Sequence, residues 1–370
     1  MSRPVSLPLK KLPSLEDKRH SLETCVFCPK LCRSACPVSN AEPTETLTPW
    51  GKMSMSYFAA NGSVAMEPTF AAPTWGCTGC HACKGSCDHK NDVATTLLTA
   101  RAAFVAEGVA PPAAMKTIQR FPEHQAATAD AVHELSMLPV VDPASPTSVL
   151  VGCTYARGAI AAAKDAVSAT AKVVEENVSL AKECCGLPLL LAGDTKGFTA
   201  QAKRFADSVR GKRELVVVDA GCAMALKVRY AEVGVSLEPR VEVFLERAMG
   251  ALGRMKTIAG DENVRYHDPC QLSRGLGVVE APRAILTKLL GKAPLEFPNN
   301  REKSVCSGGG GLVPVTMPET AKTMAKTRTA EHDEAGGGKI VTACASSLLQ
   351  FRRAGADAED IATWINRGLA

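Results

Sequence analysis

The chain has 370 residues, of which 46% are apolar and 22% charged, and its formal net charge is +5. This composition is typical of a globular protein and excludes a disordered chain, while the length suggests two or three domains. The charge is too small, and the Lys/Arg runs are too short, to favour a nucleic-acid-binding protein. Cysteine is the outlier, because the chain holds 15 and eight of them fall within residues 25–87.

The amino-terminal region and the hydropathy bear on cellular location. No apolar run is long enough for a transmembrane segment, and residues 1–20 lack the apolar core of a signal peptide. We therefore expect a cytoplasmic protein in which residues 1–20 form a mobile tail. Thiols stay reduced in that compartment, so dense cysteines indicate metal binding rather than disulfides.

The region that follows the tail has helical patterns between its cysteines. Thr48 can cap a helix in which Pro49 occupies the first turn and which ends before Gly62. Apolar residues recur at helical spacing over residues 93–105. We predict an α-helical ferredoxin-like domain over residues 21–110, with its cysteines in loops at the helix ends.

Two runs of four cysteines have the spacing of iron–sulfur loops. The first run is C-x2-C-x3-C-x3-C-P, and the second is C-x2-C-x2-C-x3-C, with Asp88 in place of the final Pro. Three thiolates on one loop converge on one cubane, whereas the fourth reaches the neighbouring cluster. We therefore predict two [4Fe–4S] clusters, held by Cys25, Cys28, Cys32 and Cys87 and by Cys77, Cys80, Cys83 and Cys36. Zinc is the alternative, since C-x2-C pairs also bind zinc.

The second half of the chain reads as a duplicated α/β unit. Residues 111–147 are rich in Ala and Pro and are expected to form a linker with one or two helical turns. Short apolar strands then alternate with helices, which predicts parallel sheets. Cysteines recur at offsets of 117, 122 and 122, in the pairs Cys153 and Cys270, Cys184 and Cys306, Cys222 and Cys344. We predict two repeated cysteine-rich α/β domains over residues 148–255 and 256–370.

The repeated cysteines are candidate metal ligands. Each is expected where a strand ends and a helix begins, the edge at which open α/β sheets bind ligands. The first repeat offers four thiols for a further cluster, Cys153, Cys184, Cys185 and Cys222. The second offers three, Cys270, Cys306 and Cys344, because Ser307 stands at the second twin position. The alternative is that these cysteines are small buried hydrophobes.

Nucleotide-binding motifs do not explain the run Gly308–Gly311. The G-x-G-x-x-G pattern requires a glycine where Val313 stands, and no Walker A motif occurs. We therefore expect no flavin or NAD on this chain.

The combination of motifs resembles a known family. Two ferredoxin-type runs followed by two CCG cysteine-rich domains are similar to the iron–sulfur subunit of glycolate oxidase, to the C subunit of anaerobic glycerol-3-phosphate dehydrogenase, and to a fusion of the C and B subunits of heterodisulfide reductase. The segment PWGKM at residues 49–53 resembles the Pro-Arg-Gly-Arg segment of that family. The full CCG domain of heterodisulfide reductase ends in C-x-x-C, whereas Ala225 and Ser347 stand at those final positions here.

The resemblance implies the function that we expect. We expect an iron–sulfur electron-transfer subunit of a flavin-dependent dehydrogenase of the hydroxy-acid or glycerol-3-phosphate type, with a flavoprotein partner and a quinone or another acceptor. Any membrane association is expected to be peripheral, through a partner. One alternative is a thiol/disulfide reductase acting at Cys184 and Cys185. Another is a redox sensor whose folding depends on its cluster.

Overall fold

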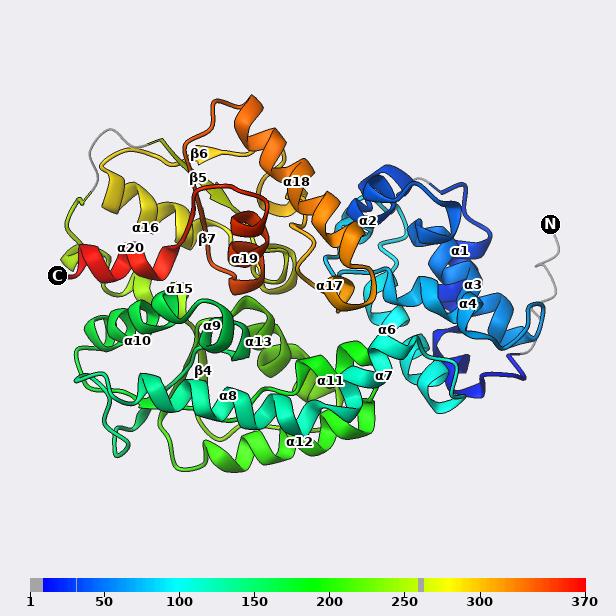
Figure 1. The fold of residues 1–370 in the computed structure, drawn as a ribbon, viewed down its shortest axis with the longest axis horizontal. Helices are drawn as coiled ribbons and strands as arrows, with labels where there is room; N and C mark the ends of the chain where they lie inside the picture. Colours follow the sequence, from blue (N-terminus) through cyan, green and yellow to red (C-terminus); the bar gives the residue numbers. More distant parts are fainter. Residues whose placement is uncertain (1–8, 31, 259–262) are drawn as a thin grey trace. The chain divides into compact units, whose positions relative to one another are not determined.

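A computed structural model describes residues 9–30, 32–258 and 263–370 (Figure 1). The chain forms two compact units, and the first contains the residues up to Gln119 together with the segments Pro188–Thr195 and Gly308–Met324. The second unit contains Arg120–Leu187, Lys196–Ser307 and Ala325–Ala370. Two short segments of the α/β sequence therefore pack with the amino-terminal unit. Among the described residues, every helix is too short or too polar to span a bilayer.

The first unit is built from helices, as its sequence predicts. Thr48 caps the helix that begins at Pro49 by accepting a hydrogen bond from the Gly51 amide, and Gly62 ends it in the left-handed conformation. The α-helices are α1 (Arg19–Val26), α2 (Pro37–Ala41), α3 (Pro49–Asn61), α4 (Pro68–Ala71), α5 (Ala82–Gly85), α6 (Val93–Ala106), α7 (Pro112–Gln119) and α17 (Val313–Thr316). Helix α3 packs against α1 and α6 in the core of the unit.

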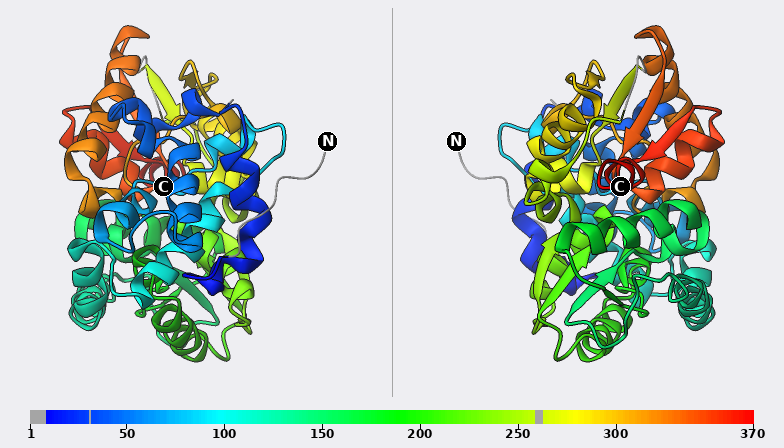
Figure 2. Two further views of the ribbon diagram at one scale, coloured as in Figure 1. Left: turned by 90° about the vertical axis from the view of Figure 1, so that its right-hand side faces the viewer. Right: turned by 90° about the vertical axis from the view of Figure 1, so that its left-hand side faces the viewer.

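Residues 9–20 do not form the tail that we expected. Leu9, Leu12 and Leu15 are each at most 2% exposed and belong to the core of the first unit. Leu9 and Leu12 precede a short 3-10 helix, η1 (Pro13–Lys18), which contains Leu15 and leads directly into α1 (dark blue in Figure 2). The mobile-tail expectation is wrong there because three leucines at three-residue spacing bury one face, although lysines lie between them. Residues 1–8 of the expected tail lie outside the described residues.

The second unit contains two parallel sheets of four strands. The first sheet has the order β2-β1-β3-β4 and the second the order β6-β5-β7-β8. Their strands are β1 (Thr147–Leu150), β2 (Ser179–Leu180), β3 (Glu214–Val217), β4 (Arg240–Val243), β5 (Val264–His267), β6 (Leu295–Glu296), β7 (Lys339–Thr342) and β8 (Ala358–Asp360). The identical order of equivalent strands agrees with the duplication that the cysteine offsets predict.

Helices connect these strands, as parallel pairing requires. Those that lie wholly or partly in the second unit are α8 (Phe121–Leu135), α9 (Cys153–Gly158), α10 (Ile160–Val174), α11 (Leu187–Ala192), α12 (Thr195–Ser208), α13 (Ala220–Met224), α14 (Tyr230–Glu232), α15 (Phe244–Met249), α16 (Glu280–Leu290), α18 (Pro318–Glu334), α19 (Ala345–Arg353) and α20 (Ile361–Gly368).

The region that we expected to be a linker is mostly helical. Helices α7 and α8 fill most of residues 112–135, and Phe121, Val132 and Leu135 are buried. The prolines misled the prediction, because Pro112 and Pro122 stand in the first turn of a helix, where proline fits.

The two repeats of the second unit contact each other through equivalent pairs of helices. Helix α10 of the first repeat packs on α20 of the second, and α16 of the second packs on α15 of the first. Helix α9 likewise contacts α19, while α13 contacts the π-helical segment η7 (Gln271–Leu276). This reciprocity is the pattern of a pseudo-twofold axis. The second group of pairs carries or adjoins the repeated cysteines, so both cysteine sets lie near the contact between the repeats.

Candidate metal centres

The eight cysteines of the first unit gather around two cavities. None of the 15 cysteines, all of which lie in the described residues, forms a disulfide. One cavity is lined by Cys25, Cys28, Cys32, Cys83 and Cys87. The other is lined by Cys36, Cys77, Cys80 and Cys83. The structure therefore brings together the two quartets that the spacing predicts, with Cys83 facing both cavities, and the ligand role of each thiol stays a prediction.

The first quartet is partly buried and strongly self-repelling. Burial, followed by the neighbouring cysteines, raises the pKa of Cys25 to about 12 and that of Cys32 to about 11. The Asn91 side-chain amide donates a hydrogen bond to the Cys25 sulfur at 3.1 Å. Four thiolates can coexist at such a site only when a cationic group binds them, which is the chemistry of a metal cluster.

A lysine is buried beside the second quartet. Lys52, on α3, is only 1% exposed, and its Nζ lies 3.4 Å from the Cys36 sulfur. Among the described residues no carboxylate forms an ion pair with it. Burial opposes the charged thiolate, yet the ammonium of Lys52 holds the pKa of Cys36 below its ordinary value. The fully buried lysine thus faces the thiol that the sequence assigns to the second cluster.

An arginine holds the loop of the second quartet in place. Arg101, on α6, is 2% exposed and donates hydrogen bonds to the carbonyl oxygens of Thr74 at 3.0 Å and Cys77 at 2.9 Å. Its guanidinium also reaches the carbonyls of Leu191 at 2.9 Å and Gly311 at 3.0 Å. The described residues include no carboxylate paired with it. Arg101 therefore fixes the Cys77 loop against the two segments of the first unit that come from the α/β sequence.

Gly311 shows how closely those backbones approach. Its φ is +65°, and a Cβ there would lie 2.0 Å from the Cys77 carbonyl oxygen. Any side chain would collide with the backbone of the cysteine loop, so the glycine-rich run serves close packing.

The two quartets fit [4Fe–4S] clusters on the chemistry of their donors. Each offers four sulfurs around one cavity, and the second is accompanied by two buried cations that lack an anionic partner among the described residues. An unpaired buried cation is costly, whereas an anionic cluster with its thiolates would neutralise it.

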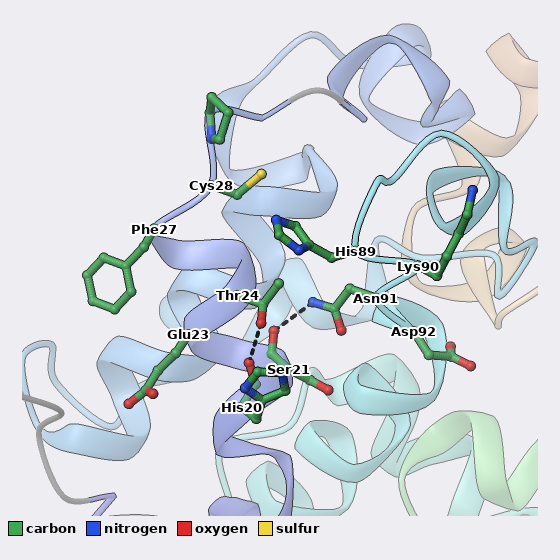
Figure 3. A pocket seen from close by; sticks show the side chains of 11 residues that line it. His20, Ser21, Glu23, Thr24, Phe27, Cys28, His89, Lys90, Asn91 and Asp92 are labelled. Carbon is green, nitrogen blue, oxygen red and sulfur yellow. Dashed lines mark hydrogen bonds between the residues drawn. The ribbon is translucent and has the colours of Figure 1, made fainter. Parts of the chain in front are cut away.

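A surface depression adjoins the first quartet (Figure 3). It has a volume of about 650 Å³ and is lined by residues of α1 and of the segment before α6. Figure 3 shows the sulfur of Cys28 at its edge, beside the imidazole of His89. Phe27 is 62% exposed and points away from these two groups. The first quartet is thus the one that reaches an open surface.

In the second unit, the four cysteines of the first repeat form a connected group. Cys153 hydrogen-bonds Cys184, which contacts Cys185, and the Cys185 sulfur lies 3.4 Å from that of Cys222. The bond with Cys184, followed by burial, raises the pKa of Cys153 well above its ordinary value. This set therefore also suits a metal that displaces the thiol protons.

The strands place this set as expected. Cys153 begins α9 just after β1, and Cys222 lies in α13 just after β3. The twin cysteines lie in the loop between β2 and α11. In the second repeat, Cys306 departs from the expectation, because it follows the 3-10 helix η8 (Arg301–Lys303) rather than a strand.

His124, which sequence reasoning missed, faces this group. It lies on α8, and its ring nitrogen is within 4.8 Å of the sulfurs of Cys153 and Cys184. The Arg157 guanidinium lies 2.8 Å from Nδ1 of His124. Because arginine can only donate, Nδ1 accepts and the proton of the neutral ring sits on Nε2. That buried Nε2 has no nitrogen or oxygen partner among the described residues. The nearby cysteine sulfurs are therefore the acceptors available to its N–H.

In the second repeat, two serines stand at positions where the complete cysteine motif has sulfur ligands. The Oγ atoms of Ser307 and Ser347 lie 2.9 Å apart, and Ser347 also faces Nε2 of the buried His267 at 3.5 Å. Burial raises the pKa of Cys344 to about 12. The two serines satisfy each other, so this site does not require a metal in the way that a set of thiolates does.

Comparisons with known proteins agree with this organisation. A family model described as a 4Fe-4S dicluster domain matches residues 21–91. A model described as a cysteine-rich domain matches twice, over residues 147–227 and 264–352. The two [4Fe–4S] clusters, the ferredoxin-like domain and the duplicated cysteine-rich domains predicted from the sequence are therefore confirmed.

Two of the similar curated proteins are subunits of reductases. The chain is 28% identical to the B subunit of fumarate reductase (CoM/CoB) from Methanothermobacter marburgensis, across 90% of this chain and 68% of that protein. It is 24% identical to the D subunit of dihydromethanophenazine:CoB–CoM heterodisulfide reductase from Methanosarcina barkeri, across 90% and 91%. It is 23% identical to lactate utilization protein A 1 of Bacillus mycoides, across 46% and 72%.

Proposed function

We propose that this chain, which carries a 4Fe–4S dicluster domain followed by two cysteine-rich domains, is the electron-transfer subunit of an oxidoreductase complex whose donor is a flavoprotein. The observation that carries the proposal is the pair of four-thiol cavities in one helical unit. Bound there, [4Fe–4S] clusters accept and donate single electrons. The similar fumarate and heterodisulfide reductase subunits support a role within a complex.

The residues of the first unit have distinct roles in this proposal. Cys25, Cys28, Cys32 and Cys87 would hold one cluster, and Cys36, Cys77, Cys80 and Cys83 the other. Asn91 and Lys52 donate hydrogen bonds to ligand sulfurs, and such bonds tune cluster potentials. The depression beside Cys28 is where we place the contact with the flavoprotein donor.

Iron and sulfide counts on the anaerobically reconstituted full chain test the proposal. We expect about eight irons from the two quartets, with about four lost in either Cys28→Ala or Cys80→Ala. Photoreduced flavin mononucleotide should reduce both clusters, and menadione should reoxidise them. Zinc in place of iron, or a colourless protein, would refute the proposal.

A second candidate function is thiol/disulfide reduction at the first cysteine-rich repeat. It is favoured by the contact between the Cys185 and Cys222 sulfurs at 3.4 Å, because neighbouring thiols are what exchange with a disulfide requires. The test is electron flow from reduced flavin to cystamine. A Cys184→Ala variant that keeps the full rate with this disulfide would contradict the second function and leave the first intact.

A further inference from the structure

The two cluster cavities differ in the buried positive charge beside them, and the cavity of Cys36, Cys77, Cys80 and Cys83 has more of it. The cavity of Cys36, Cys77, Cys80 and Cys83 is lined by Lys52, which is 1% exposed, and Arg101, which is 2% exposed, binds the backbone of its Cys77 loop. Lys52 reaches the Cys36 sulfur, and Arg101 reaches the Cys77 carbonyl. Within the described residues, neither cation has a carboxylate partner, so both positive charges are available to whatever the cavity holds.

The other cavity has no equivalent in the part of the chain that the structure describes. Its hydrogen-bond donor to sulfur is the neutral side chain of Asn91. Lys30, which lines this cavity, has a side chain that is 35% exposed, and its ammonium lies 3.9 Å from the centre of the Trp50 ring and 3.5 Å from a Glu45 carboxylate oxygen. Solvent, the aromatic ring and the carboxylate all weaken its field at the cavity.

Reduction adds one negative charge to a cluster. A buried cation stabilises that charge more than the same cation does in water, because the low dielectric of the interior preserves the attraction. Hydrogen bonds to sulfur and net charge are among the factors that set the potential of such clusters. An unpaired ammonium at one cluster and none at the other therefore separates their potentials.

Resting on the proposed function, we infer that the Cys36/Cys77/Cys80/Cys83 cluster has the higher reduction potential, and that Lys52 is the positioning residue that sets it. With this order of potentials, an electron shared between clusters held by the two quartets would favour the quartet beside Lys52. Of the two clusters, the second is thus the one at which an electron would preferentially reside.

Backbone contacts hold the loop of this quartet against two segments of the α/β sequence. Arg101 joins the Cys77 loop to Leu191 and Gly311, which lie in the segments that follow Cys185 and Ser307 in the sequence. Hydrogen bonds from Arg101 therefore connect the loop of the second quartet to one chain segment from each cysteine-rich repeat.

A redox titration of the reconstituted full chain, followed by EPR, tests the order of potentials. The variants Cys28→Ala and Cys80→Ala, each with one cluster removed, identify which midpoint belongs to which quartet. We expect the higher midpoint to belong to the second quartet. Equal midpoints, or the opposite order, would overturn the inference.

Substitution of Lys52 tests the cause. In Lys52→Met we expect the equilibrium constant for reduction of the second cluster to fall at least tenfold. This lowers its midpoint potential by about 59 mV for one electron, and the midpoint of the first cluster should stay unchanged. Lys52→Arg should restore most of the shift. Lys30→Met is the matched control and should move either midpoint by less. If Lys52→Met fails to fold, Lys52→Gln replaces it, with iron content as the check.

The outcomes separate the two proposals. A chain that binds no iron refutes the proposed function. A chain that binds iron at both quartets, but whose second cluster keeps its midpoint in Lys52→Met or Lys52→Gln, refutes only the role of Lys52.

Discussion

The two cysteine-rich repeats share one fold but differ in what their cysteine sites require. Both have a four-stranded parallel sheet of the same order. The first repeat gathers four thiols and the imidazole of His124. The second has three cysteines, because Ser307 replaces the second twin cysteine, and Ser307 bonds at 2.9 Å to Ser347, which stands where the first repeat has Ala225. The comparison shows that a duplicated scaffold preserves its sheet while a few side chains decide whether the site needs a metal.

The largest effect expected from this comparison concerns iron content. Cys184→Ala should remove the further cluster of the first repeat, about four irons, because it breaks a connected set of thiols. Cys306→Ala should leave the iron content unchanged, since its site has already lost thiols to serine. Iron and sulfide counts on the reconstituted variants measure this. Equal losses in both variants would show that the repeats are equivalent.

The converse change should give the second repeat a site. The double variant Ser307→Cys/Ser347→Cys supplies five thiols with Cys270, Cys306 and Cys344, and we expect additional iron under anaerobic conditions. The readout is iron per chain, with thiol counting to detect a disulfide between the new cysteines. An unchanged iron count with all thiols free would show that more than two serines separate the sites.

His124 provides a smaller test within the first repeat. Because its Nε2–H faces sulfur, His124→Ala should lower the reduction equilibrium of the cluster there about tenfold, or about 59 mV. His133→Ala on the same helix is the matched control, since His133 is exposed. Redox titration followed by EPR measures both variants. Identical potentials would mean that His124 only packs against the site.

The smallest expected effect concerns a contact between the repeats. Tyr155 of the first repeat donates to Asp360 of the second. Burial raises the pKa of Asp360 to about 7, against the bond from Tyr155, with Asp219 and Arg352 also acting on it. The folded chain holds this proton more tightly than the unfolded chain, so its stabilisation is present below about pH 4 and is lost as the pH rises through about 7.

Asp360→Asn should therefore remove that pH dependence, with Tm differences of about 2–4 °C for each 1 kcal/mol. Thermal unfolding between pH 4 and pH 8 measures this. A variant whose Tm still declines like that of the parent chain would exclude Asp360 as the source.

The sequence predicted the elements that depend on local patterns. The helix after Thr48, strands β1, β3, β5 and β7, and the duplication at constant cysteine offsets all follow from capping, alternation and repetition. Prediction failed where pattern and packing disagree. The leucines of residues 9–15 are interrupted by lysines, and α7 begins in a stretch rich in Ala and Pro that resembles a linker.

By itself, the amino-acid sequence determined the kind of chemistry, because cysteine spacing within a short loop limits which irons the thiolates can reach. Only the tertiary structure decided the surroundings of those thiolates. Lys52 is 16 residues from Cys36, Asn91 is 66 from Cys25, and His124 comes from a different helix than the cysteines that it faces. Whether a polar side chain ends at a sulfur or in water depends on how helices pack, and packing is a property of the whole fold.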